Sequence, residues 1–204
     1  MPPYGKPDHW SLRAQKEGYP ARSVYKLKEI DEKFGLLRRP AVPLKALDLG
    51  AAPGSWSLFV LRKMGGGVDL TAADLAPLSR RYDRNLFGGG NFHFVLGDIT
   101  AGETREALLA RGPFGLILSD AAPETTGNRS VDTLRSLALA ETALEYAASA
   151  LLRGGNLVVK VFQSGETPEL LRRLRGLFSS GKSFKPSACR PGSFEIYYIG
   201  LGKT

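Results

Sequence analysis

Short apolar runs alternate with helix-like segments along most of this chain, and this alternation restricts the fold more than any other feature. Short apolar runs indicate buried strands, whereas apolar residues spaced three to four apart indicate helices. The predicted strands are 44–49, 68–73, 92–96, 114–118 and 157–162, and the predicted helices are 22–34, 57–64, 103–109, 134–152 and a segment that begins at Thr167 and Pro168. The alternation predicts an α/β fold with a doubly wound, mostly parallel sheet that carries helices on both faces.

The first twenty residues do not follow this alternation. Residues 1–20 show no apolar periodicity, so we predict a basic N-terminal arm over 1–21 and a single domain over 22–204. Ser23 is the expected N-cap of the first helix, because its hydroxyl can accept a hydrogen bond from the first turn.

The C-terminal part also differs from the rest. The long 134–152 helix is expected to end at Gly154 and Gly155. Two strand-like runs follow near the end of the chain, around Ser183 and over 194–199, with no helix between them. A hairpin joins such strands, so the last strand is expected to be antiparallel to its neighbour.

The net charge is +8, from 28 Lys and Arg against 20 Asp and Glu. The basic excess lies in residues 1–40 and 162–204, whereas 41–161 are neutral. If the two ends meet in the fold, they form a basic face suited to a polyanion such as RNA. The alternative is a basic surface that only improves solubility.

Several classes of protein are excluded. A single cysteine, Cys189, leaves neither a disulfide framework nor a multi-cysteine metal site. The first twelve residues have no apolar core of a signal peptide, and no run approaches the length that crosses a membrane. We therefore expect a cytoplasmic protein that uses no metal and no membrane, and we expect a monomer.

A glycine-containing turn over 47–56 follows the first predicted strand and leads into a helix. Gly50 and Gly54 lack a Cβ, so this turn allows the backbone to approach a ligand closely. The turn has Ala52 and Pro53 where a dinucleotide-binding motif has its middle glycine, and a pyrophosphate therefore fits less well.

Acidic residues end the next two predicted strands. Asp74 lies 20 residues after Gly54, where doubly wound folds place an acid that accepts hydrogen bonds from a ribose. Asp98 ends the third strand, where a carboxylate can accept the amine of an adenine. Together with the glycine turn they predict a pocket for an adenosine-bearing ligand. The alternative for each acid is an ordinary turn or helix-capping role.

Three charged residues stand beside apolar runs. Lys160 lies inside a strand that otherwise reads as buried, Asp120 ends the fourth strand, and Glu195 opens the last one. Because the carboxyl ends of parallel strands share one edge, and an antiparallel strand begins at that edge, these side chains are expected to converge beside the pocket. The alternative is a purely structural ion cluster, which stabilises a fold only weakly.

Several of these segments, in the same order, resemble motifs of the FtsJ/RrmJ family of S-adenosylmethionine-dependent RNA ribose 2′-O-methyltransferases. The resemblance covers nearly the whole chain, from about residue 22 to 200, and its segments are 22–27, 48–57, 119–123, 158–163 and 190–197. It implies a Rossmann-like methyltransferase sheet and S-adenosylmethionine as the cofactor. The family's Lys–Asp–Lys–Glu catalytic tetrad corresponds to Lys26, Asp120, Lys160 and Glu195. Its cofactor positions correspond to Gly54, Trp56, Asp74, Asp98 and Asp120, beside the Gly50 of the turn.

The resemblance also implies the reaction. Methyl transfer to a ribose hydroxyl requires alignment, removal of one proton and exclusion of water. An unperturbed lysine is a poor base at neutral pH, so we expect Lys160 chiefly to orient the 2′-OH, with late deprotonation. The expected substrate is a uridine of large-subunit (23S) rRNA, naked or in the assembled large ribosomal subunit, and tRNA is the alternative.

Two other function classes remain open: a nicotinamide-dependent oxidoreductase, which the Ala52–Pro53 turn disfavours, and a non-catalytic RNA-binding module, which the complete tetrad disfavours. The expected RNA contacts are Arg13, Lys16, Arg22 and Lys28 near one end and Lys182, Lys185 and Arg190 near the other. The segment 77–90, with three arginines and three consecutive glycines, is longer than compact bacterial members of the family lead us to expect, and could read the substrate.

Overall fold

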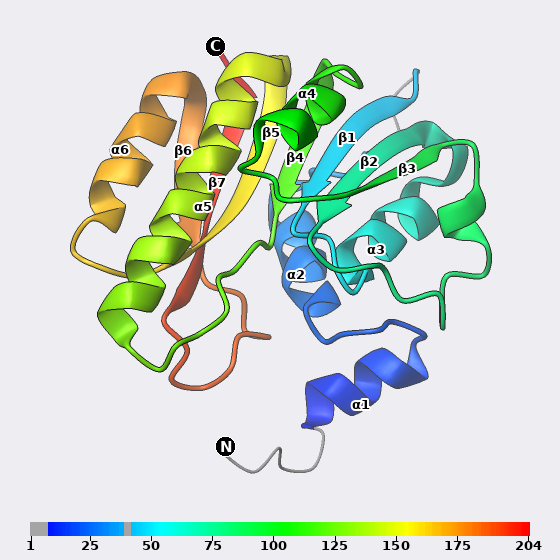
Figure 1. Ribbon diagram of the computed structural model, residues 1–204, viewed down its shortest axis with the longest axis horizontal. Helices are drawn as coiled ribbons and strands as arrows, with labels where there is room; N and C mark the ends of the chain where they lie inside the picture. The colour runs from blue at the N-terminus through cyan, green and yellow to red at the C-terminus, as the bar shows by residue number, and fades with distance from the viewer. Residues whose placement is uncertain (1–7, 39–41) are drawn as a thin grey trace.

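A computed structural model describes residues 8–38 and 42–204. Its centre is a seven-stranded sheet in the order β3-β2-β1-β4-β5-β7-β6 (Figure 1). The strands are β1 (Leu44–Leu49), β2 (Val68–Asp74), β3 (Phe92–Leu96), β4 (Phe114–Ser119), β5 (Leu151–Phe162), β6 (Phe178–Phe184) and β7 (Glu195–Lys203). The first five strands are parallel to one another, and β7 is antiparallel to both of its neighbours. The predicted α/β class and the antiparallel last strand are confirmed.

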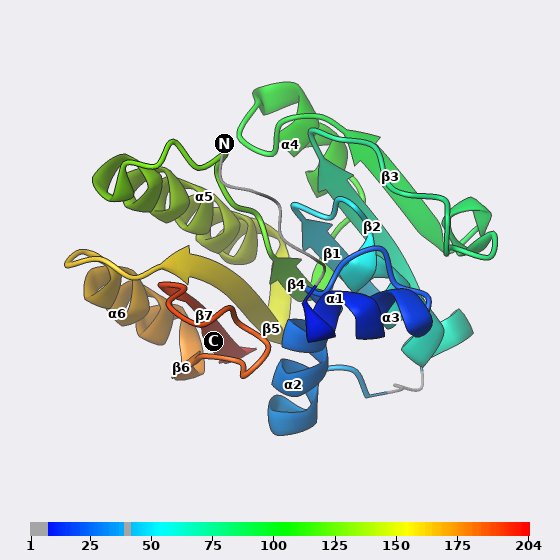
Figure 2. The same ribbon diagram turned by 90° about the horizontal axis from the view of Figure 1, so that it is seen from below.

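Helices cover both faces of the sheet (Figures 1 and 2). The helices are α1 (His9–Lys16), α2 (Val24–Phe34), α3 (Ser55–Met64), α4 (Gly102–Leu109), α5 (Arg129–Ala150) and α6 (Thr167–Leu177), with short 3-10 turns η1 (Gly65–Gly67) and η2 (Leu86–Gly88). The first three contribute to one buried apolar cluster and the last three to another, on opposite sides of the sheet. Within the described residues, no helix is long and apolar enough to cross a membrane.

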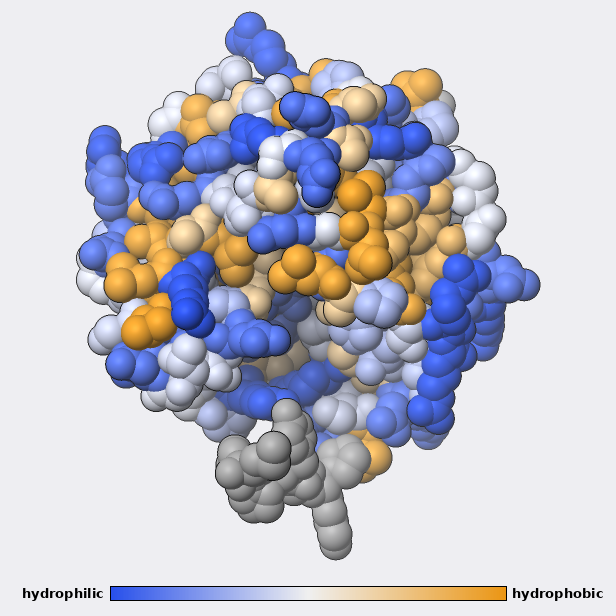
Figure 3. All heavy atoms as spheres, in the orientation of Figure 1, coloured by the Kyte–Doolittle hydropathy of each residue, from blue (hydrophilic) through white to orange (hydrophobic). Residues whose placement is uncertain are grey.

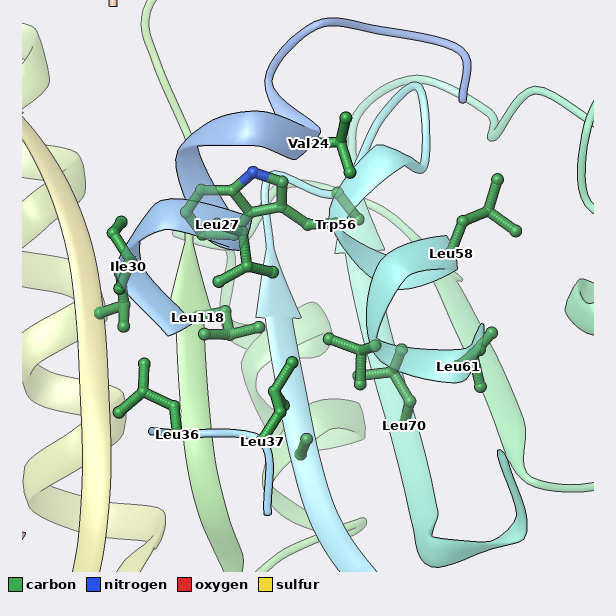
Figure 4. Packing of buried hydrophobic residues seen from close by; sticks show 14 of the residues in the cluster. Val24, Leu27, Ile30, Leu36, Leu37, Trp56, Leu58, Leu61, Leu70 and Leu118 are labelled. Carbon is green, nitrogen blue, oxygen red and sulfur yellow. The ribbon is translucent and has the colours of Figure 1, made fainter. Parts of the chain in front are cut away.

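The apolar cluster beneath α2 and α3 places the first catalytic candidate (Figure 4). Val24, Leu27 and Ile30 are fully buried, which is the predicted stripe of α2. Trp56 lies between α2 and α3 in Figure 4, and its indole N–H donates a 2.9 Å hydrogen bond to the carbonyl of Ser23. This bond joins the start of α2 to α3, so the remaining faces of α2 are held in a defined orientation.

Three local predictions need correction. Residues 9–16 form α1 although they show no clear apolar period, because Asp8 caps the helix through Ser11 and Trp10 packs on Tyr25. Ser23 occupies the N-cap position of α2 but its side chain makes no capping bond. The long helix α5 ends at Ala150 rather than at the following glycines.

The residues after α5 are extended and pair with β4 from Leu151 onward. Gly154, with φ of +79°, therefore lies inside β5 and not at a helix end. An alanine- and leucine-rich run favours helix locally, but pairing with β4 overrides that preference here.

Candidate active site

A pocket of about 640 Å³ opens at the carboxyl edge of the sheet, and Figure 3 shows the surface hollowed there. The turns after β1, β2, β3 and β4 form its walls together with α5. Its lining includes the predicted residues Gly50, Asp74, Asp98, Asp120 and Lys160, and also Ala52, Leu75, Ile99, Thr100, Ala121, Ala122, Pro123, Glu124, Arg135, Ala138 and Leu139. Four carboxylates and two basic side chains are among these residues, so the pocket suits a cationic ligand in an otherwise basic protein.

The turn after β1 approaches the loop after β4 very closely. Gly50 has φ of +73°, and a Cβ on it would lie 2.5 Å from the Cα of Ala121. Backbone N–H groups of Gly50 and Ala51 both donate to the carbonyl of Ala73, at 2.9 and 3.1 Å. Only glycine therefore fits at position 50, and the turn forms one wall of the pocket.

Asp74 and Asp98 are anchored at the ends of β2 and β3. The two carboxylate oxygens of Asp74 accept 2.8 Å hydrogen bonds from the N–H groups of Ala52 and Ala76. Asp98 accepts from the N–H and the hydroxyl of Thr100, and these two hydrogen bonds lower the pKa of its carboxyl. Both carboxylates thus have fixed orientations in the lining of the pocket.

Lys160 and Asp120 form an ion pair at the pocket wall. Lys160 Nζ lies 3.0 Å from Asp120 Oδ1 and also donates to the Asp120 carbonyl. The Tyr197 hydroxyl donates to the same Oδ1 at 2.7 Å. Burial alone raises the pKa of Asp120, but Lys160, Lys26 and the Tyr197 hydrogen bond outweigh it and lower that pKa overall. Asp120 is therefore ionised at neutral pH.

Lys26 and Glu195 form a second, largely buried ion pair with Nζ and Oε2 2.8 Å apart, and 11% of each side chain is exposed. Burial lowers the pKa of Lys26, yet attraction to Asp120 and Glu195 outweighs burial and raises it overall. Lys26 therefore remains protonated. It comes from α2, whereas Glu195 begins β7 opposite Phe162 at the end of β5.

The Tyr197 side chain joins the two ion pairs. It is fully buried, it is the cross-strand partner of Lys160, and the Lys26 ammonium lies 5.9 Å from the centre of its ring. Tyr197 was not among the residues predicted from the sequence. A usable signal was present, because Tyr197 lies two residues after Glu195 and therefore on the same face of the last strand.

Two predicted cofactor residues lie outside the pocket lining. Gly54 has φ of +105° and packs against Phe87, whose ring atom would lie 2.8 Å from an added Cβ. Trp56 is 2% exposed, and its N–H bonds to Ser23 as described above. Both residues shape the elements around the pocket and do not face into it.

Cys189 lies near the second ion pair, in the loop before β7. Burial and the neighbouring Glu195 raise the pKa of its thiol to about 12, so the thiol stays protonated and is no nucleophile. Across residues 8–38 and 42–204, no group of three His, Cys, Asp or Glu side chains could hold a metal ion.

The predicted RNA-contact residues fall into two groups. Lys16, Lys182 and Arg190 are exposed and make no hydrogen bond or ion pair with other described side chains. The others already have partners: Arg22 bonds to Asp8 and the Ala188 carbonyl, Arg13 and Lys28 both pair with Glu17, and Lys185 bonds to the Ser193 carbonyl.

Comparison with known proteins gives one consistent family. The FtsJ-like methyltransferase family model matches residues 19–203. A protein of Treponema denticola named ribosomal RNA large subunit methyltransferase E is 47% identical over 199 residues, which cover 97% of this chain and 96% of the relative. A protein of the same name from Oleidesulfovibrio alaskensis is 43% identical and covers 96% and 91% of the two chains.

Solved structures agree on the fold. A chain from Plasmodium falciparum superimposes with a TM-score of 0.75 at 25% identity, over 91% of this chain and 98% of that one. The human methyltransferase-like protein 13, solved in complex with SAH (S-adenosylhomocysteine), gives a TM-score of 0.61 at 18% identity, over 87% and 82% of the two chains.

Proposed function

Because the chain belongs to the FtsJ-like methyltransferase family, we propose that it transfers a methyl group from S-adenosylmethionine to a ribose 2′-OH of large-subunit rRNA. One observation carries this proposal: two lysine–carboxylate pairs, Lys160–Asp120 and Lys26–Glu195, meet at Tyr197 beside a pocket for a small ligand. Lys160 and Asp120 both line this pocket, so the cluster can reach a bound ligand and is not enclosed in the core.

The pocket fits S-adenosylmethionine in size and charge. Its volume, about 640 Å³, lies within the range of roughly 300–1,000 Å³ that small-molecule sites occupy. Asp74 would accept hydrogen bonds from the ribose, Asp98 from the adenine amine, and Asp120 would face the cationic end of the ligand. Gly50 would allow the close approach. When bound, the cofactor supplies a methyl group on a sulfonium, which needs no metal for activation.

Four side chains would then prepare the acceptor hydroxyl. Lys160 donates to the carbonyl and to Oδ1 of Asp120, and this leaves its third N–H free to turn toward the pocket. Asp120 stays ionised between Lys160 and Tyr197. The Lys26–Glu195 pair holds α2 and β7 together beside the pocket. Glu195 also balances the charge of Lys26, which reduces its repulsion of Lys160.

We infer that Lys160 mainly orients the 2′-OH, and that the hydroxyl proton leaves late, to water, once the O–CH3 bond is forming and the S–CH3 bond is breaking. A fixed ammonium can direct one lone pair of the hydroxyl at the methyl group, which is a contribution of alignment. The pH dependence of single-turnover rates tests this role. A steep rise that follows the ionisation of a lysine would show Lys160 to be a true base instead.

The substrate is proposed from the relatives, which are named for the large ribosomal subunit, and from the charge of this chain. The basic excess at the two ends lies on the elements that bring Lys26 and Glu195 to the site, where an RNA backbone would enter. The tRNA alternative keeps the same chemistry.

A cytoplasmic location and a monomeric state remain predictions.

A methyl-transfer assay with three acceptors tests the proposal. Large ribosomal subunits, naked rRNA and bulk tRNA come from cells that lack this protein, and digested nucleosides are identified by mass spectrometry after reaction with labelled S-adenosylmethionine. We expect a 2′-O-methylated nucleoside only in large-subunit RNA. Lys160→Met, which keeps an unbranched side chain but removes the amine, should abolish the label, whereas Arg153→Ala at the opposite edge should not.

Two other outcomes of this assay would change the proposal. Label in tRNA alone would move the substrate and keep the chemistry. Cofactor binding without transfer to any of the three acceptors would contradict the enzymatic proposal and favour an RNA-binding role.

A further inference from the structure

The segment between β2 and β3 is a folded part of the structure. The Ser79 N–H donates a 3.0 Å hydrogen bond to the carbonyl of Pro53, in the turn that borders the pocket. Phe87 is buried and its ring lies 4.7 Å from that of Phe92, measured between centroids. The segment is thus fixed to the glycine-containing turn after β1 at one end and to β3 at the other.

Arg62 of α3 fastens this segment to the end of α1. Its guanidinium donates to the Tyr82 carbonyl at 2.7 Å and to the Gly18 carbonyl at 2.9 Å, and it lies over the ring of Tyr19. The chain after α1 and the chain around Tyr82 therefore lie side by side.

The three arginines of the segment differ in their surroundings. Arg80 pairs with the buried Asp83 at 2.8 Å, so its charge is used within the fold. Arg81 and Arg84 are exposed and pair with no carboxylate among residues 8–38 and 42–204, and Arg81 lies only over the Tyr82 ring.

Arg84 is also held in an unfavourable backbone conformation. It has φ of +50° and is followed by Asn85 with φ of +65°. Glycine or asparagine occupies the left-handed region at lower cost than arginine, and side chains retained there often belong to functional sites. The Arg84 guanidinium forms no hydrogen bond or ion pair with the described residues, so we infer that its partner is another molecule.

We propose that Arg81 and Arg84 bind the phosphate backbone of the substrate RNA and form, with Lys16 at the end of α1, an outer wall of the RNA-binding surface. The inference rests on the proposed function. An RNA strand is the occupant because guanidiniums without a carboxylate partner bind phosphate groups, and because the segment begins at the pocket where a ribose must be presented. Arg81 and Arg84 lie outside the pocket lining, so their charges would strengthen RNA binding and orient the RNA but take no part in methyl transfer.

The test compares two double variants. Arg81→Ala with Arg84→Ala removes the proposed contacts. Lys45→Ala with Arg153→Ala removes the same charge from exposed side chains at the opposite edge of the sheet. Thermal unfolding midpoints confirm that each variant is folded. KM for RNA, kcat and cofactor affinity are measured, together with the salt dependence of RNA binding by fluorescence anisotropy on a Lys160→Met background.

For the Arg81/Arg84 variant we expect KM for RNA to rise about tenfold with kcat and cofactor affinity unchanged. The slope of log K against log salt should decrease by about 1.4 to 1.8, the value for two phosphate contacts. Equal effects in both double variants would overturn the proposal. A rise in KM only for assembled subunits, and not for naked RNA, would overturn it in favour of a protein contact. The anisotropy measurement needs no methyl transfer. It therefore tests whether Arg81 and Arg84 bind RNA even if the proposed activity fails.

Discussion

A single carboxyl group behind the pocket stands out among the residues. Asp48 in β1 is fully buried; its Oδ2 accepts a 2.6 Å hydrogen bond from Ser57, while Oδ1 has no partner. Burial is the main cause that raises the pKa of Asp48 to about 7; the nearby Asp120 and Asp74 also raise it, and the Ser57 hydrogen bond opposes them. The group is therefore protonated in mildly acidic solution and becomes charged near neutral pH.

The raised pKa predicts a pH-dependent stability. Between about pH 4 and pH 7 the unfolded state has released the Asp48 proton and the folded state still holds it, so stability falls as the pH rises through this range. The rise of this pKa from 3.8 to about 7 corresponds to about 4 kcal/mol of stability. Asp48→Asn cannot ionise, so its free energy of unfolding should lose this dependence. Urea unfolding of both proteins from pH 4 to 8 measures it, and parallel curves would contradict the prediction.

Gly50 shows how a missing side chain contributes to the site. A methyl group there would meet the backbone of Ala121, which cannot move without displacing the pocket wall. Gly50→Ala is expected to destabilise the fold by about 2–4 kcal/mol and to abolish cofactor binding.

Isothermal titration with S-adenosylmethionine and thermal unfolding measure the two effects of this change. Gly66→Ala is the matched control, since no atom within 4 Å would meet its Cβ. Full cofactor affinity in Gly50→Ala would show that the turn has another way to adapt.

At the scale of elements, α2 and the loop before β7 are clamped together. Glu29 accepts three hydrogen bonds from this loop, at 2.6 Å and 2.9 Å from the N–H and hydroxyl of Ser187 and at 2.9 Å from the Ala188 N–H. Arg22 donates to the Ala188 carbonyl at 2.6 Å. Because the same helix carries Lys26 and the same loop leads into Glu195, the clamp sets the distance between them.

Glu29→Gln tests this clamp. A neutral amide weakens all three bonds, so we expect about a tenfold lower kcat and a midpoint lower by a few degrees, with unchanged cofactor affinity. Glu32→Gln, an exposed residue on the same helix, should leave all three quantities at the wild-type level. If kcat were unchanged in Glu29→Gln, the loop position would not control the Lys26–Glu195 pair.

Sequence patterns predict well those elements that are buried on one face, such as α2, or on both faces, such as the central strands. The strands of the parallel sheet and the apolar stripe of α2 follow directly from their periodicity, and the edge where Asp120, Lys160 and Glu195 meet follows from strand direction. By contrast, α1 depends on the cap at Asp8 and on the Trp10–Tyr25 contact. The start of β5 depends on its pairing with β4. Glu29 reads as an ordinary helix residue because its partners lie 158 and 159 positions away.

At the scale of the whole molecule, ligand binding is coupled to folding through the pocket. Turns from four strands and one helix line it, so an occupied pocket joins elements across the sheet. S-adenosylmethionine at a hundred times its Kd should add about 2.7 kcal/mol of stability and raise Tm by roughly 5–11 °C.

Differential scanning fluorimetry measures this shift, and NADH at the same concentration is the control. No shift with NADH is expected, because the turn at Ala52 and Pro53 does not favour a pyrophosphate. A larger shift with NADH than with S-adenosylmethionine would instead favour the oxidoreductase reading of the fold.

The position of β7 has a consequence for how the protein is made. This strand comes last in sequence but lies between β5 and β6, and it carries Glu195 to a lysine 169 residues earlier. A chain leaves the ribosome amino end first, at roughly 5–20 residues per second. During synthesis, the pocket walls from β1 to β4 can assemble while the strand that completes the second ion pair is still inside the exit tunnel. The catalytic machinery is therefore completed later than the pocket walls, and a nascent fragment that already has the glycine turn of the pocket still lacks Glu195.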